Sequence, residues 1–106
     1  MPHCTLFYSK TLNLEALDVI VSKLHQAMLE SGLFVENAIK VRAIAAESML
    51  TAGEKAPHLH AEIKLLQGRD EVQKSHLATL VNAVLRTSNA CHSVEVIDLS
   101  PYYYNK

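Results

Sequence analysis

Two long stretches of helical periodicity, each lying between two strand-like runs, constrain the fold of this chain more than any other feature. In residues 13–31 and again in residues 70–87, apolar side chains recur three or four residues apart, which places them on one face of a helix. The first stretch carries them at Leu14, Leu17, Val21, Leu24 and Met28, and the second at Leu77, Leu80, Val81, Val84 and Leu85. The spacing therefore predicts two amphipathic helices.

The residues that bound these stretches are typical of helix ends. Asn13 can cap the start of the first helix, and Gly32 can adopt the left-handed conformation that ends it. Asp70, followed three residues later by Gln73, resembles a capping box. We therefore expect the helices to span residues 13–31 and about 70–87.

Four strand-like runs flank the two helices. In the run 39–46, Lys40 and Arg42 share one face, and the other face carries Ile39, Val41, Ala43 and Ala45, as in a strand with one buried face. The run 59–66 alternates in the same way, with Leu59, Ala61, Ile63 and Leu65 on one face. The four predicted strands are residues 4–8, 39–46, 59–66 and 93–99.

The order of these elements predicts an α+β fold in which a β-α-β unit occurs twice. The linker between the units is residues 51–57, where Gly53 and Pro57 are turn signals. A strand-helix-strand crossover is right-handed and joins parallel strands. Two such units side by side form a four-stranded mixed sheet with both helices on one face. With 106 residues, we expect one domain, residues 1–106.

The second face of this sheet carries apolar side chains among its charges. We expect other subunits to cover that face, since a domain of this size gains much from association. The C-terminal tail, residues 101–106, is aromatic and too short for a core of its own, so we expect it to pack on a neighbouring chain. The apolar side chains of the second face are Ile44, Ala46, Leu66, Ile97 and Leu99.

The charge balance argues against two classes of partner. Lys and Arg number 10 and Asp and Glu 11, which gives a formal net charge of -1 and no basic excess for nucleic acid or a membrane surface. No apolar run approaches the ~20 residues that span a bilayer. The first residues lack the pattern of a signal peptide, and Cys4 and Cys91 lie far apart without CxxC pairing. We expect reduced thiols and a cytoplasmic location.

Pro2 is the first candidate for chemistry. Removal of Met1 would leave a secondary amine at the start of the chain, and an α-amino group titrates near ~8 in peptides. Burial or nearby cations would lower that pKa and leave more free base at neutral pH. Met-Pro starts are common, however, and taken alone most indicate only that Met is trimmed.

Three cations are the next candidates. Lys40 and Arg42 share a strand face, and Arg69 lies at the turn between the third strand and the second helix. A helix start favours anions, and a guanidinium can hold a carboxylate with two hydrogen bonds. The alternative for each is a solvated charge or an ion pair, such as Arg69 with Glu71.

The six histidines raise the question of a metal site. His58 and His60 are two residues apart on a predicted strand and could face the same way. No spacing matches a zinc pattern such as HExxH or paired CxxC, so surface histidines are the favoured interpretation. With three glycines and no phosphate-binding loop, we expect no metal and no cofactor.

A set of short motifs, in order along nearly the whole chain, resembles a known family. They include Met1-Pro2-His3, Tyr8-Ser9, the run 24–27, Ser31-Gly32-Leu33-Phe34, the run 39–43, Gly68-Arg69-Asp70 and the run 93–96. Together they resemble the 5-carboxymethyl-2-hydroxymuconate Δ-isomerase family of the tautomerase superfamily.

The resemblance implies a homotrimer that moves a proton within a small unsaturated keto or enol dicarboxylate from aromatic catabolism. Pro2 would be the general base, and Arg69 matches the arginine of the family's Gly-Arg turn. The second family arginine falls at Lys40, with Arg42 two residues later. Lysine lacks the planar fork of arginine, which puts the family's usual substrate in question while leaving acid-base chemistry at Pro2.

Two alternatives to the isomerase use the same fold. The chain could be a non-catalytic trimeric binding or scaffolding module, as the lysine at position 40 or a retained Met1 would suggest. It could also be a sensor that binds a small acid in the same pocket without proton transfer. Turnover of small unsaturated acids distinguishes both alternatives from the isomerase.

Overall fold

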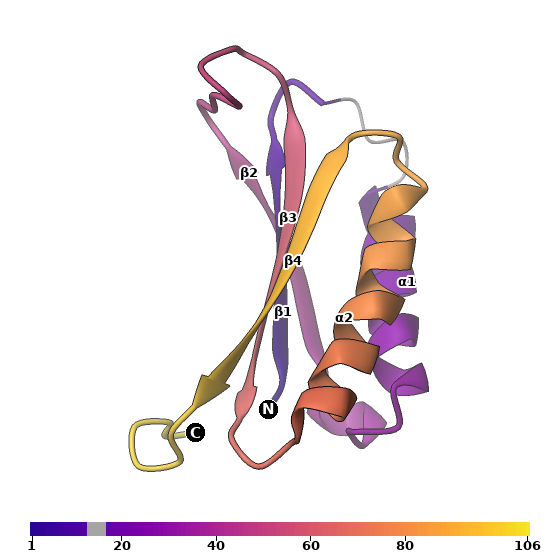
Figure 1. Ribbon diagram of the computed structural model, residues 1–106, viewed down its shortest axis with the longest axis vertical. Helices are drawn as coiled ribbons and strands as arrows, with labels where there is room; N and C mark the ends of the chain where they lie inside the picture. Colours follow the sequence, from indigo (N-terminus) through magenta and orange to yellow (C-terminus); the bar gives the residue numbers. More distant parts are fainter. Residues whose placement is uncertain (13–16) are drawn as a thin grey trace.

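Residues 1–12 and 17–106 are described by a computed structural model (Figure 1). The first half of the chain forms a strand, a helix, a short 3-10 helix and a second strand. The second half forms a strand, a helix and a strand. The elements are β1 (His3–Ser9), α1 (Leu17–Glu30), η1 (Glu36–Ala38), β2 (Lys40–Ala46), β3 (His58–Leu66), α2 (Glu71–Arg86) and β4 (Cys91–Leu99).

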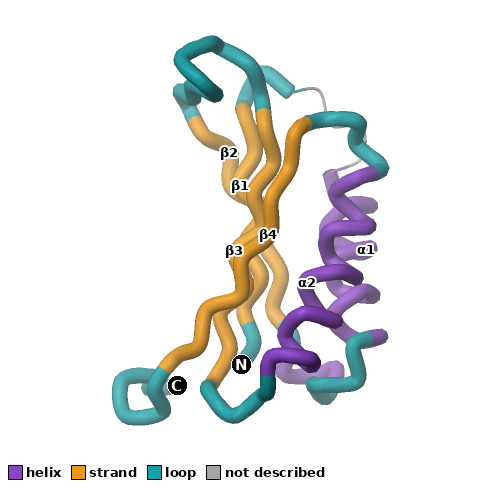
Figure 2. The backbone as a smooth tube through the Cα atoms, in the orientation of Figure 1, coloured by secondary structure: helices purple, strands orange, loops and turns teal. Residues whose placement is uncertain are grey.

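The four strands form one mixed sheet in the order β2-β1-β3-β4. β1 is parallel to β2, and β3 is parallel to β4, as the two crossovers predict. The units join through the antiparallel pair of β1 and β3. Both helices cover the same face of the sheet, and the opposite face is left open (Figures 1 and 2). The predicted α+β fold is therefore confirmed.

The core lies between the sheet and the two helices. Side chains alternate along a strand, so β1 and β3 each send every second residue toward the helices. Burying one such leucine or isoleucine contributes roughly 1.5–3 kcal/mol. The predicted apolar stripes of the helices are confirmed for the stripe residues that the core contains. Leu14 lies outside the described residues. The core comprises Cys4, Leu6, Leu24, Ala27, Met28, Leu59, Ala61, Ile63, Leu65, Leu77, Val81 and Leu85.

The predicted ends of the helices are confirmed wherever the structure describes them. The Asp70 carboxylate accepts a hydrogen bond from the Gln73 amide, and the Gln73 side chain accepts one from the Asp70 amide, which completes the capping box. Gly32 has a φ of 73°, the left-handed conformation expected after α1. The predicted cap at Asn13 lies outside the described residues.

Two details of the elements differ from the prediction. The fourth strand begins at Cys91 and not at Ser93, because its parallel pairing with β3 already starts opposite His58. The segment before β2 forms η1, since the amides of Ala38 and Ile39 bond to carbonyls three residues earlier. Both differences depend on backbone pairing and not on side-chain periodicity.

The open face of the sheet carries an apolar band among polar side chains. Ile44 is 47% exposed, and its neighbour Phe7 on β1 is half-buried. Leu66, Ile97 and Leu99 are also half-buried although no helix covers them. The expectation that other subunits cover this face stays a prediction.

Candidate active site

Three of the residues singled out in the sequence lie at one end of the sheet. Figure 1 shows both chain termini and the turn between β3 and α2 at this end, which we call the terminal end. Pro2 precedes β1, Lys40 opens β2, and Arg69 lies in that turn. Parallel pairing puts His3 opposite Lys40, and the Lys40 amide donates to the Pro2 carbonyl over 3.2 Å. The fold thus brings Pro2 close to Lys40.

The amine at the start of the chain lies in positive surroundings. The Pro2 ring is fully buried, and its nitrogen is joined to Met1 by a peptide bond. Burial lowers the pKa of the Met1 amine below 8.0. A hydrogen bond from the Lys40 ammonium to the neutral amine, and the charges of Lys40, Lys106 and Arg69, lower that pKa further. An amine at this end of the chain therefore loses its proton more readily than one in water.

Arg69 is held by backbone carbonyls and by an aromatic ring. Its Nη2 donates to the Leu33 carbonyl over 2.9 Å, and its Nη1 donates to the Leu66 carbonyl over 3.4 Å. Its guanidinium carbon lies 5.1 Å from the centre of the Phe34 ring. The alternative pairing of Arg69 with Glu71 is absent from the described structure. Arg69 is thus a fixed cation at the terminal end.

Lys40 and Arg42 lie on the open face, as their alternation in the sequence predicts. The Lys40 ammonium donates to the Ala38 carbonyl over 2.8 Å. Arg42 instead reaches across to β1, where its Nη1 donates to Thr5 Oγ1 over 3.1 Å and its Nη2 lies 2.9 Å from His3 Nδ1. Lys40 therefore lies beside the chain start, whereas Arg42 contacts two side chains of β1.

Sequence reasoning missed three residues of the terminal end. His3 Nε2 lies 3.0 Å from the Tyr104 hydroxyl, with the two rings edge to face. Lys106, two residues further on, is one of the charges that lower the pKa of the chain-start amine. The aromatic tail was the only signal, and it suggested contact with a neighbouring chain. Tyr104 contacts its own chain, while Tyr102 and Tyr103 are each 90% exposed and their contact with a neighbour stays a prediction.

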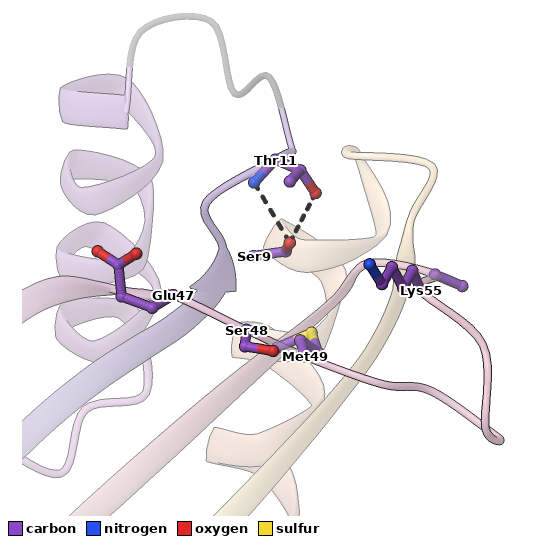
Figure 3. Close-up of a pocket in the computed structure, with 7 residues that line it drawn as sticks. Ser9, Thr11, Glu47, Ser48, Met49 and Lys55 are labelled. Carbon is purple, nitrogen blue, oxygen red and sulfur yellow. Dashed lines mark hydrogen bonds between the residues drawn. The ribbon is translucent and has the colours of Figure 1, made fainter.

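The opposite end of the sheet holds a separate cavity of about 160 Å³. Figure 3 shows the Ser9 hydroxyl beside Thr11, whose amide donates to it over 3.3 Å and whose hydroxyl lies 2.9 Å away. The Glu47 carboxylate forms an exposed ion pair with Lys10 at 3.1 Å. This cavity offers hydroxyl groups but neither the chain-start amine nor an arginine among the described residues that line it: Ser9, Thr11, Glu47, Ser48, Met49, Lys55 and Ala56.

The histidines and cysteines outside the terminal end do not gather into a metal site. His58 Nδ1 lies 2.8 Å from the Thr51 hydroxyl, and His60 contacts Ser93 and Glu95. Across residues 1–12 and 17–106, no group of three or more His, Cys, Asp or Glu side chains is arranged to hold a metal ion.

The two cysteines are free and lie in different surroundings. Cys4 is in the core, where burial raises the pKa of its thiol to about 12, whereas Cys91 is exposed. None of the helices formed by the described residues has the length and apolar character needed to cross a membrane.

The sheet order and the two crossovers define the fold class of this protein. This is the tautomerase-like α+β fold, and solved structures share it over almost the whole chain. A 5-carboxymethyl-2-hydroxymuconate isomerase from Deinococcus radiodurans R1 is 23% identical, with a TM-score of 0.87 over 99% of this chain and 87% of that one. The protein Pt0534 inactivated by 2-oxo-3-pentynoate is 17% identical, with a TM-score of 0.88 over 98% of this chain and 90% of that one.

A third similar structure is a fused 4-OT wild-type asymmetric trimer, which is 14% identical with a TM-score of 0.82 over 98% of this chain and 91% of that one. No curated protein sequence matches this chain. The family model described as 5-carboxymethyl-2-hydroxymuconate isomerase matches residues 2–100. The chain belongs to the 5-carboxymethyl-2-hydroxymuconate isomerase family and is therefore an isomerase.

Proposed function

We propose that this isomerase moves a proton within a small unsaturated keto or enol carboxylate, with Pro2 as the general base once Met1 is removed. The observation that carries this proposal is that Pro2 lies beside Lys40 at the terminal end, where burial and the charges of Lys40, Lys106 and Arg69 lower the pKa of the Met1 amine. A general base works best when its pKa lies near the working pH. The same surroundings would make the Pro2 secondary amine a base at neutral pH.

The proposed reaction is a balanced proton shift. The Pro2 nitrogen takes a proton from an enol oxygen or from a carbon next to the carbonyl, and the resulting ammonium returns that proton to a different carbon. Negative charge builds up on the substrate oxygen between the two steps. Nearby cations stabilise that charge in a site with little water, so they lower the barrier.

Arg69, Lys40 and Arg42 are the proposed groups that bind the substrate carboxylate. A guanidinium carries five N–H donors, and the two carbonyls on Arg69 leave others for a carboxylate. Lys40 adds a charge next to Pro2, although without the two-pronged geometry of an arginine. Arg42 can add a further contact through the donors that Thr5 and His3 do not use.

A homotrimer that packs its open sheet faces together is the assembly we propose. The half-buried Phe7, the exposed Ile44 and the half-buried Ile97 support it, because a second copy would remove this apolar band from water. One similar structure is a trimer, as stated above. The free thiols of Cys4 and Cys91 fit the cytoplasmic location that we keep as a prediction. Light scattering tests the assembly, and a monomer in solution would rule it out.

The proposed base can be tested by covalent labelling. Intact-mass measurement first establishes that Met1 is absent. The protein is then treated with 2-oxo-3-pentynoate, an unsaturated 2-oxo acid of the proposed substrate class. The free Pro2 nitrogen should add to one alkyne carbon, and its proton should pass to the other. The N-terminal peptide then gains the mass of one whole reagent molecule.

Two variants make this labelling specific. The Cys91→Ser variant removes the exposed thiol and should still be labelled at Pro2. A chain with one extra residue before Pro2 should be neither labelled there nor active, because its proline nitrogen is an amide. Full turnover of phenylenolpyruvate, an enol carboxylate, by the extended chain would remove Pro2 from the mechanism.

A further inference from the structure

A chain of hydrogen bonds runs from β2 through β1 to the C-terminal tail. Arg42 Nη2 lies 2.9 Å from His3 Nδ1, and His3 Nε2 lies 3.0 Å from the Tyr104 hydroxyl. The proposed function above uses neither His3 nor Tyr104. The three side chains nevertheless come from three separate parts of the sequence and meet at His3, the residue that follows Pro2.

The chemistry of these groups fixes the direction of each hydrogen bond. A guanidinium only donates, so His3 Nδ1 must be the acceptor from Arg42. A neutral imidazole with an acceptor at Nδ1 carries its proton at Nε2, and this proton must point to the Tyr104 oxygen. Tyr104 therefore accepts from His3, which leaves the Tyr104 hydroxyl hydrogen free for another partner.

The surroundings of His3 favour this neutral form over the charged one. Burial lowers the pKa of His3, and the positive charges of Arg42, Lys40, the chain start and Lys64 lower it further. A neutral His3 has one N–H group. It accepts from Arg42 at Nδ1 and donates to Tyr104 at Nε2. The arrangement is thus consistent only with a relay that ends in a free hydroxyl hydrogen on Tyr104.

Tyr104 also lines a cavity at the terminal end. The cavity measures about 160 Å³ and is bounded by the last residues of β4 and by the tail, at Asp98, Leu99, Ser100, Tyr103 and Tyr104. The charge of Asp98 is balanced by Lys74 at 2.8 Å. The Gln67 amide donates to the Leu99 carbonyl over 3.0 Å, which ties the end of β4 to the turn that carries Arg69.

We propose that Tyr104 is a substrate-binding residue of this isomerase, with its hydroxyl donating to the substrate oxygen that becomes negatively charged. His3, held by Arg42, is the positioning residue that aims this hydroxyl. The inference rests on the proposed function, because it assigns Tyr104 to the same proton shift.

Removal of the single hydroxyl tests this role. The Tyr104→Phe variant should lower kcat and kcat/KM for phenylenolpyruvate together by about 10- to 100-fold, as expected when a donor to the developing charge is lost. The Tyr102→Phe variant is the matched control, since Tyr102 is 90% exposed two residues away, and it should equal the unmodified protein. If Tyr104 only anchored the tail, its variant would lose thermal stability with kcat unchanged.

The outcomes separate this inference from the proposed function. A Tyr104→Phe variant with normal kcat, alongside an inactive chain extended before Pro2, overturns the role of Tyr104 and leaves Pro2 as the base. An extended chain with normal turnover overturns the proposed function instead. No turnover of any of a panel of small unsaturated keto and enol carboxylates, by protein shown to lack Met1, overturns the proposed function and with it the role of Tyr104.

A spectroscopic measurement tests the relay independently of activity. Nitrogen-15 NMR of the imidazole groups, with His3 assigned through a His3→Gln variant, should show the tautomer protonated at Nε2. The Tyr104→Phe variant should shift the Nε2 signal and leave the signals of His60 and His92 in place. A tautomer protonated at Nδ1, or no shift in the variant, contradicts the relay.

Discussion

The two ends of the sheet are built from the same strands but offer different chemistry. The terminal end gathers the start of the chain, Lys40, Arg69 and the Tyr104 tail. The opposite end has a cavity of about 160 Å³ lined by hydroxyl groups and by Glu47, whose charge is paired with Lys10. The residues proposed for catalysis therefore lie at the terminal end, and the cavity at the opposite end has neither the chain-start amine nor an arginine among the described residues that line it.

This difference follows from the topology. Because β1 and β2 are parallel, their first residues, His3 and Lys40, meet at the terminal end. The antiparallel pairing of β1 and β3 brings the end of β3 to that same end, and the turn after it carries Arg69. The opposite end receives the end of β1 and the linker before β3, which bring no arginine to the cavity there.

The largest expected effect is the loss of the Pro2 amine. A chain with one residue added before Pro2 should lose at least about 100-fold in kcat/KM for phenylenolpyruvate, since general-base catalysis commonly contributes that much. Circular dichroism should show an unchanged fold. Retention of more than half the activity would contradict the placement of the catalytic base at the terminal end.

Replacement of the Arg69 fork should have the next largest effect. Arg69→Lys keeps the charge but loses the planar donors, and we expect KM to rise about 10-fold with a smaller change in kcat. The variant also loses hydrogen bonds to the Leu33 and Leu66 carbonyls, so thermal unfolding is measured in parallel. An unchanged KM in a folded variant would limit Arg69 to a structural role.

Removal of the charge at Lys40 should change the pH profile. The Lys40 charge favours the free amine, so Lys40→Met should raise the pKa of the Pro2 amine and move the acidic limb of kcat/KM to higher pH. Lys40→Arg keeps the charge and should leave the limb in place. A limb that moves to lower pH in the Met variant would contradict this sign.

His3 should make stability depend on pH in one direction. Its pKa is lower in the folded chain than the 6.5 of the unfolded one, so the unfolded state binds more protons between these values. Its contribution is complete above 6.5 and is lost as pH falls through the folded pKa. His3→Gln should flatten the rise of the unfolding free energy with pH in this window, and an equally steep curve for the variant would refute the assignment.

The smallest effect is expected at the opposite end. Ser48→Ala and Glu47→Gln should leave kcat/KM within about twofold, and each should change stability by about 0.5 kcal/mol or less, as usual for exposed groups and surface ion pairs. Kinetics with phenylenolpyruvate and thermal unfolding measure both. A tenfold loss of activity in either variant would indicate that the active site lies at the opposite end and not at the terminal end.

Much of the fold could be predicted from the sequence, because short-range patterns of apolar and capping residues determine its helices and strands. The stripe of Leu77, Val81 and Leu85 and the capping box at Asp70 define α2 without any long-range information. The alternation in β2 places Lys40 and Arg42 on the open face. Crossover handedness then fixes the parallel pairs.

The rest of the candidate site depends on contacts between distant residues. His3 and Tyr104 lie 101 positions apart, and they meet because the tail turns back after β4, where the Tyr103 amide donates to the Ser100 carbonyl. The spacing of apolar residues along the sequence does not predict such a turn. The assignment of Pro2 as a base came from resemblance to the family and not from spacing, since a Met-Pro start alone carries little information.

The proposed mechanism depends on a free Pro2 nitrogen that is unprotonated at neutral pH, and the pKa of this nitrogen can be measured directly. Protein labelled with nitrogen-15 proline and shown by mass to lack Met1 would be titrated by NMR, with Pro2 distinguished from Pro57 and Pro101 by its response to pH. We predict that Pro2 titrates below the value of a short unstructured peptide that begins with the same proline, because the charges at the terminal end favour the free amine. A Pro2 nitrogen that titrates at or above that value, or one that is still joined to Met1, would contradict the account.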